Sequence, residues 1–161
     1  SVFNVFGSYA TLIHGPKRRQ TVHIPAKVSG MRVVNIGVAF TNSQVESVHI
    51  PPSIRHISSG CFKNCTRLSE INMPRDLRFI GAHAFEGCIR LQKVDLPNGL
   101  LQIGEEAFKK CEQMKTLYIP STVVQIGGNA FSECGNLTIL CKENSYAANW
   151  LAQHNIPFQF L

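Results

Sequence analysis

The segment Leu91-Gln-Lys-Val-Asp-Leu-Pro-Asn-Gly-Leu-Leu-Gln-Ile-Gly-Glu-Glu-Ala-Phe-Lys-Lys-Cys111 decides the fold, because the chain writes this pattern about five times. Prolines stand at positions 51, 74, 97 and 120, and cysteines stand at 65, 88, 111 and 134. Members of both series are 23 residues apart, as are phenylalanines 62, 85, 108 and 131. Repetition with a fixed period of about 20 to 50 residues is typical of stacked supersecondary units. The sequence therefore predicts a solenoid.

Written in full, the pattern is L-x-x-h-x-h-P-x-x-h-x-x-I-G-x-x-A-F-x-x-C-x-x, where h is an aliphatic residue or Met. Over residues 22–141 it resembles the BspA-like (Treponema-type) leucine-rich repeat family. The resemblance implies an α/β repeat solenoid of about five 23-residue units, with a parallel sheet on its concave face and a cap at each end. The first unit departs by four extra residues around Ser29-Gly-Met-Arg32, and the second has Ile57-Ser58 for Ile-Gly and Cys61 for Ala.

Within each unit, the residues before proline are expected to form a strand. In the quoted unit Val94 and Leu96 alternate with Lys93 and Asp95, and proline ends the strand because it has no N–H to donate. Each turn of the coil would lay the next strand beside the last, which gives a continuous parallel ladder. The Ile-Gly pair is expected to bend the coil back, and the phenylalanines to stack as a buried column.

The chain is expected to be a single leucine-rich repeat domain over residues 1–161, with repeats at 22–141. Residues 1–21 do not match the repeat and predict two short strands, Phe3–Tyr9 and Ala10–His14, which would cap the first unit. Residues 142–161 predict a cap helix that begins at Asn144-Ser145, followed by a closing strand. The residues expected on the buried face of that helix are Tyr146, Ala147, Trp150 and Leu151.

The outward positions of the pre-proline strands form the candidate ligand-binding surface. The resemblance implies that this concave face is the usual partner-binding surface; the alternative is that these side chains are polar because they face water. One column contains His23, His49, Asn72, Asp95 and Tyr118, and its neighbour contains Thr21, Ser47, Glu70, Lys93 and Thr116. His23 beside His49 could ligate a metal, but a solvated pair is the simpler interpretation, so no metal site is predicted.

The net charge of +6 is concentrated in the amino-terminal half. Residues 1–68 hold eight basic residues and one acidic residue, whereas residues 69–161 hold eight and nine. Such a surplus could attract a sulfated glycan, teichoic acid or acidic protein, or could simply keep one end of the solenoid soluble. The spacing follows no nucleic-acid groove, so no nucleic-acid partner is predicted. The candidate basic patch contains Lys17, Arg18, Arg19, Arg55, Arg67, Arg78 and Arg90.

The cysteine column has several possible roles. Adjacent strands could bring Cα atoms within disulfide range, but equivalent positions in stacked units point the same way. Cys61 and Cys65 lack the second pair that a zinc site needs, and no histidine partner can be assigned to a nucleophilic thiol. Ser43 stands in the same column of the first unit. The column is therefore interpreted as buried free thiols that fill space.

No catalytic motif is present: there is no phosphate-binding glycine loop, no Gly-x-Ser-x-Gly and no His-Glu-x-x-His. The chain is therefore expected not to be an enzyme and not to need a cofactor. No apolar run approaches the roughly 20 residues of a membrane helix, and no signal peptide is visible. The resemblance implies a cell-surface or secreted module that binds a protein or glycan in adhesion or protein–protein interaction. The chain is expected to be a monomer. The alternatives are a structural spacer within a longer surface protein and a polyanion binder that uses the basic half.

Overall fold

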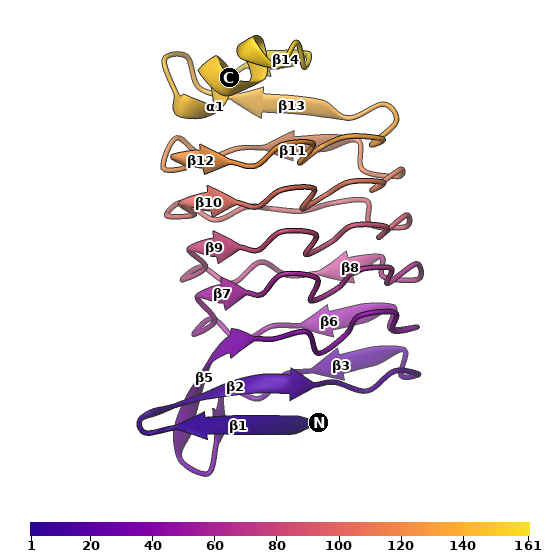
Figure 1. Cartoon of the computed structure of the whole chain (residues 1–161), viewed down its shortest axis with the longest axis vertical. Helices are drawn as coiled ribbons and strands as arrows, with labels where there is room; N and C mark the ends of the chain where they lie inside the picture. Colours follow the sequence, from indigo (N-terminus) through magenta and orange to yellow (C-terminus); the bar gives the residue numbers. More distant parts are fainter.

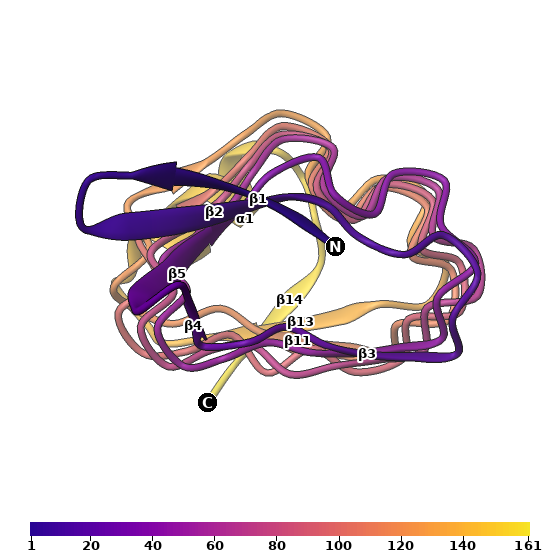
Figure 2. The ribbon, with the colours of Figure 1, turned by 90° about the horizontal axis from the view of Figure 1, so that it is seen from below.

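The computed structural model describes all 161 residues. The chain is a solenoid of about seven coils stacked along one axis (Figure 1). Seen along that axis, the coils of the central region nearly superpose (Figure 2). One continuous core of 44 buried apolar residues fills the interior of the stack. The predicted repeat solenoid is confirmed.

The largest sheet lies on the side of the coil that follows each proline. Its order is β1-β2-β5-β7-β9-β10-β12, with β4 also paired to β5, and its strands are parallel from β2 onward along this path. The strands are β1 (Val2–Phe6), β2 (Tyr9–His14), β4 (Lys27–Val28), β5 (Met31–Ile36), β7 (His56–Ile57), β9 (Phe79–Ile80), β10 (Gln102–Ile103) and β12 (Gln125–Ile126). For the segment that follows each proline, the sequence analysis expected only a bend at the Ile-Gly pair. That expectation was wrong. Equivalent isoleucines of successive coils pair directly, so the segment carries the longest ladder.

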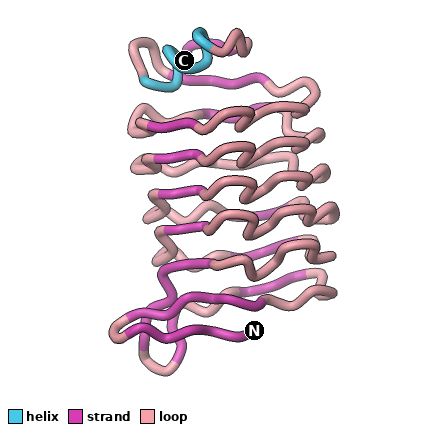
Figure 3. The backbone as a smooth tube through the Cα atoms, viewed as in Figure 1, coloured by secondary structure: helices cyan, strands magenta, loops and turns pink.

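The opposite side of the coil, which carries the pre-proline segments, has two shorter parallel sheets (Figure 1). One contains β3 (Thr21–His23), β6 (Ser47–His49) and β8 (Glu70–Ile71), and the other contains β11 (Thr116–Tyr118), β13 (Thr138–Cys141) and β14 (Phe158–Phe160). In the unit of residues 91–111, the predicted strand is reduced to a single β-bridge between Lys93 and Thr116. Most of each coil is turn and loop (Figure 3).

Asn72 shortens the pairing between β6 and β8. Its side-chain Oδ1 accepts a hydrogen bond from the Ile50 N–H, and its Nδ2 donates to the Ile50 carbonyl, both at 2.8 Å. The amide side chain therefore takes the place that backbone groups of a neighbouring strand would occupy. The expected continuous sheet on this face is replaced by two segments.

A column of phenylalanines runs through the core. Rings 40, 62, 85, 108 and 131 stack with centroid separations of 5.0, 5.2, 5.3 and 6.2 Å, and neighbouring planes are within 10° of parallel. Trp150 ends the column with an edge contact on Phe131 at 6.3 Å. Because each ring contributes a large apolar area, this column joins the repeats to the carboxy-terminal helix.

The two ends of the stack differ from the repeat. β1 and β2 form an antiparallel hairpin, and the four extra residues of the first unit form a second hairpin between β4 and β5. Its turn residues Ser29 and Gly30 have φ values of 50° and 78°, as a two-residue turn with a primed conformation requires. At the other end, β14 pairs in parallel with β13.

The only helix, α1 (Tyr146–Gln153), covers the last coil. The Ser145 hydroxyl caps its first turn by accepting from the Ala148 N–H at 3.1 Å. Ala147, Trp150 and Leu151 are buried as predicted, but Tyr146 is 39% exposed and Ala148 is buried in its place. Tyr146 is the first residue of the helix and lies at the edge of its apolar face, so its side chain is not buried as predicted. No helix of the chain has the length and apolarity needed to cross a membrane.

The regular 23-residue spacing of the Ile-Gly pairs at 80–81, 103–104 and 126–127 reflects close contact between coils. A Cβ atom at Gly81, Gly104 or Gly127 would lie well inside contact distance of backbone atoms in the preceding coil. These glycines do not have positive φ values, so the requirement is for space and not for a left-handed conformation. Adjacent coils can approach closely on this side only because these positions lack a side chain.

Gly104→Ala should therefore destabilise the protein by about 1–3 kcal/mol or more, because the new methyl group forces the Ala82 backbone to move. Urea unfolding followed by circular dichroism would measure the loss. Gly128→Ala is the matched control, since nothing lies within 4 Å of a Cβ at that position. Equal midpoints for the two variants would contradict the close-approach explanation.

Candidate functional site

The pre-proline face brings together part of the predicted ligand-binding surface. A shallow open pocket of about 310 Å³ spans three coils of this face. Its lining residues are Ser47, Val48, His49, Ser69, Glu70, Ile71, Asn72, Lys93 and Asp95. Thr21, His23, Thr116 and Tyr118 extend the same columns beyond the pocket, because their strands pair in register with it or with Lys93.

Side chains on this face already make contacts with one another. The His23 and His49 rings stack at 4.3 Å with planes 6° apart. The Lys93 ammonium lies 3.0 Å from an Asp95 carboxylate oxygen, and both side chains are more than three-quarters exposed. Asn72 uses its amide on the Ile50 backbone. The surface thus offers ligands an exposed ion pair, an imidazole edge and the Glu70 carboxylate, whereas Asn72 has a structural role.

The predicted basic patch is divided among different parts of the solenoid. Lys17 donates to the Thr41 carbonyl at 2.7 Å, and Arg67 forms an ion pair with Glu46. Arg19 lies near the amino terminus in a pocket with Ser1 and His23. Arg55 instead lies beside Tyr9 and His56 on the face of the eight-stranded sheet. Arg18 and Arg90 are exposed and form no ion pair.

The cysteine column consists of buried free thiols. Each Sγ of Cys65, Cys88, Cys111 and Cys134 donates to the carbonyl of the phenylalanine one coil earlier, at 3.0–3.3 Å. Ser43 uses its hydroxyl in the same way, on the Pro16 carbonyl at 3.0 Å. The thiols therefore satisfy a backbone acceptor between coils as well as filling space, which the sequence pattern did not reveal.

Burial also disfavours the thiolate form of these cysteines. It raises the pKa of Cys65 and of Cys134 to about 11, from an ordinary 9.0, because the thiolate is poorly solvated. Burial likewise raises the pKa of Cys88 and Cys111. Since the thiolate is the nucleophile, the geometry and the pKa values favour a structural role for the column.

At pH 8 the native protein should therefore release almost no chromophore from Ellman's reagent, whereas all six thiols should react after unfolding in guanidinium. The expected cause is the combination of raised pKa and full burial. Ser121→Cys provides a control, because position 121 is exposed and its thiol should react at once. Rapid reaction of two or more native thiols would contradict this assignment.

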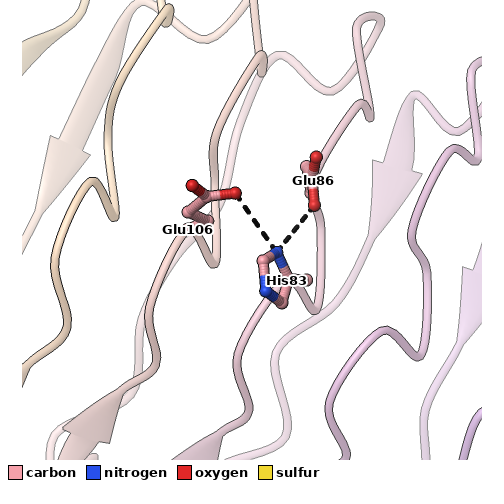
Figure 4. Close-up of side chains that lie close together, drawn as sticks. All are labelled: His83, Glu86 and Glu106. Atoms are coloured by element: carbon pink, nitrogen blue, oxygen red, sulfur yellow. Dashed lines mark hydrogen bonds and ion pairs between the residues drawn. The ribbon is translucent and has the colours of Figure 1, made fainter.

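A charged cluster joins three successive coils, and Figure 4 shows three of its members, His83, Glu86 and Glu106. His83 Nδ1 lies 2.7 Å from a Glu86 oxygen and 3.3 Å from a Glu106 oxygen. Lys63 contacts Glu86 at 2.8 Å and Lys109 contacts Glu106 at 3.2 Å. The Glu86 and Glu106 side chains are only 16% and 18% exposed. The five side chains form one ion-pair network.

The same cluster contains the residues whose geometry could hold a metal. One ligand atom from each of His83, Glu86 and Glu106 lies within 4.8 Å of the others. Lys63 and Lys109 already neutralise the two carboxylates, however, so a cation would compete with them. Sequence reasoning missed the cluster, although Glu106 stands one 23-residue period after His83 and this register places them side by side.

The protonation of Glu86 makes the stability contributed by this network depend on pH. Burial by itself would raise the pKa of Glu86, but hydrogen bonds and charge from Lys63 and His83 outweigh it and lower the pKa below its ordinary 4.5. Because the pKa of Glu86 is lower in the folded state, its carboxylate stabilises the fold at pH values above the ordinary pKa of the group. This stabilisation is lost as the pH falls through the folded-state pKa.

Glu86→Gln should thus destabilise the protein at pH 7 by about 1 kcal/mol, with a difference that shrinks toward about pH 3 as wild-type Glu86 protonates. Urea unfolding at both pH values would measure it. Glu143→Gln serves as the control, because Glu143 is exposed and forms no ion pair. A difference that stays constant with pH would show that charge is not the cause.

The fold and its repeat pattern agree with comparisons to known proteins. Residues 37–147 match the BspA type leucine rich repeat region in six copies. The chain therefore belongs to the BspA-type leucine-rich repeat family, with one more copy than the five expected from the sequence. Comparison with curated proteins gave no significant match.

Three solved structures illustrate the similarity. The T. pallidum leucine-rich repeat protein is 28% identical, with a TM-score of 0.83, and the match covers 86% of this chain and 67% of that one. A leucine-rich repeat protein of Bacteroides ovatus is 32% identical, with a TM-score of 0.76, over 86% and 38%. A leucine rich cell surface protein of Faecalibacterium prausnitzii is 25% identical, with a TM-score of 0.58, over 86% and 52%. The chain thus spans little more than a third of the Bacteroides protein and about half of the Faecalibacterium one.

Proposed function

We propose that this chain is a non-enzymatic binding module, at a cell surface or secreted, that acts in adhesion or protein–protein contact. The observation that carries the proposal is the pocket of the pre-proline face, where polar and charged side chains differ from coil to coil above a repeated core. Family membership supports a protein-binding repeat module. The description of the Faecalibacterium protein as a cell surface protein supports the location.

The proposed ligand is a protein or a glycan, because seven of the nine residues that line the pocket are polar or charged. Lys93, Asp95, Glu70 and His49 would contact it, and Tyr118 would supply an aromatic surface at the margin. We propose a monomer of one domain, in which the β1–β2 hairpin and the α1–β14 segment cover the ends of the stack. Neither a metal nor a cofactor is part of this proposal.

A polyanion is the second candidate ligand. The observation that favours it is that Arg18 and Arg19 are exposed near the amino terminus and form no ion pair. Because such contacts between exposed charges are screened by salt, binding of this kind should weaken strongly between low and physiological ionic strength.

A screen of extracellular matrix proteins, sulfated glycans and bacterial surface polymers at two salt concentrations would test both ideas. On the main proposal, binding survives salt and Lys93→Ala with Asp95→Ala weakens it about tenfold or more, as loss of central contacts does. Gln125→Ala, on the opposite sheet, should leave it unchanged. Binding lost with salt and with Arg18→Gln and Arg19→Gln would favour the polyanion, and no binding at all would favour a structural spacer.

A further inference from the structure

The outward face of the eight-stranded sheet carries two stacked rings, His56 and Phe79, between polar side chains. In the register of the parallel strands, Asn35 pairs with His56, His56 with Phe79, and Phe79 with Gln102. The His56 and Phe79 rings stack at 4.7 Å with planes 16° apart. Tyr9, which is 40% exposed, lines a shallow pocket of about 340 Å³ with Arg55 and His56. We call Tyr9, Arg55, His56, Arg78 and Phe79 the arginine–aromatic face.

Arg55 and Arg78 immediately precede His56 and Phe79, so they stand in one column on adjacent strands. Adjacent parallel strands are about 4.8 Å apart, and like charges at neighbouring positions repel. Neither guanidinium has a carboxylate within ion-pair distance. Arg78 donates once, to the Leu77 carbonyl at 3.2 Å, and its guanidinium lies beside Gly99 of the following coil, which leaves most of its five N–H groups without an acceptor.

The acid nearest to these arginines in the sequence, Asp76, forms its ion pair with Arg75 and not with Arg78. None of the eight strands of this sheet contains Asp or Glu. The pre-proline face differs, because Glu70 and Asp95 lie in its pocket. Farther along the column the arginines give way to Leu101 and Val124, and Val124 is 63% exposed. The face thus combines unpaired positive charge with exposed aromatic and aliphatic side chains.

From this arrangement we infer that the arginine–aromatic face binds an extended acidic segment of a partner protein, separately from the pre-proline pocket. Carboxylates of the segment pair with Arg55 and with Arg78, and its apolar side chains pack on Tyr9, on the His56–Phe79 stack and toward Val124. Arginine pairs well with carboxylates because its planar fork can bond both oxygens. Arginine and aromatic residues are also the types enriched at the energetic centres of protein interfaces.

A peptide fits this face better than a sulfated glycan does. A sulfated glycan would use the two arginines but has no apolar side chains to pack on Phe79 and Val124, whereas a peptide with alternating acidic and aromatic residues uses both. His56 adds a reporter of the contact. Its pKa is lowered by burial and by the charge of Arg55, so a carboxylate placed on Arg55 should raise the pKa of His56.

The test uses a fluorescein-labelled peptide of alternating glutamate and tyrosine, with fluorescence anisotropy on the whole chain. Wild type should bind, and Arg55→Gln with Arg78→Gln should weaken binding about tenfold or more. Arg18→Gln with Arg19→Gln removes the same charge elsewhere and should change the Kd less than about twofold. Titration of His56 by NMR should show its pKa raised in the complex.

Further arms separate the alternatives. A peptide with serine in place of tyrosine should bind much more weakly; equal binding by it, or by heparin alone, would overturn the peptide assignment in favour of a general polyanion surface. Equal losses in the two arginine double variants would overturn it too, as would absence of wild-type binding. Lys93→Ala with Asp95→Ala should leave this peptide's Kd unchanged, so the inference and the proposed function stand or fall separately.

Discussion

Hydrogen bonding between equivalent residues of adjacent coils is the interaction on which the rest of the structure depends. The N–H groups of Phe62, Phe85 and Phe108 each donate to the alanine carbonyl of the next coil, at 2.8–2.9 Å. The thiols of the cysteine column donate in the opposite direction, to the phenylalanine carbonyl of the preceding coil. These contacts set the distance between adjacent coils. The coils can approach to this distance only because Gly81, Gly104 and Gly127 have no side chains. The stacked rings follow from that separation.

The same separation turns every surface position of the repeat into a column whose members touch. It stacks His23 on His49 and His56 on Phe79, and it places Glu106 against His83. Chemistry on the surface therefore depends on what successive repeats place at one position, and a single substitution changes a column without altering the core. This is how one solenoid can present a mixed-charge pocket on one side and an arginine–aromatic face on the other.

Cysteine shows how much of this frame the sequence predicts. Its period and the Ser43 substitution indicated small buried fillers, and the structure confirms free buried thiols. Their hydrogen bonds to phenylalanine carbonyls could not be foreseen, because spacing gives the column but not the direction in which each Sγ points. The candidate site behaves similarly: the polar columns were predicted, but the double hydrogen bond of Asn72 to Ile50 was not.

The sequence by itself determined the solenoid, its phenylalanine column and the helix that ends it, because periodic apolar residues can be buried together only by stacking units in register. Tertiary structure alone decided which side of the coil carries the long ladder. Strand pairing requires backbone groups of residues one coil apart to meet at hydrogen-bond distance, and a repeat period is the same whether they meet or not. That condition is satisfied at Phe79 and Gln102 and fails over most of the pre-proline segment 91–96, where only Lys93 forms a bridge.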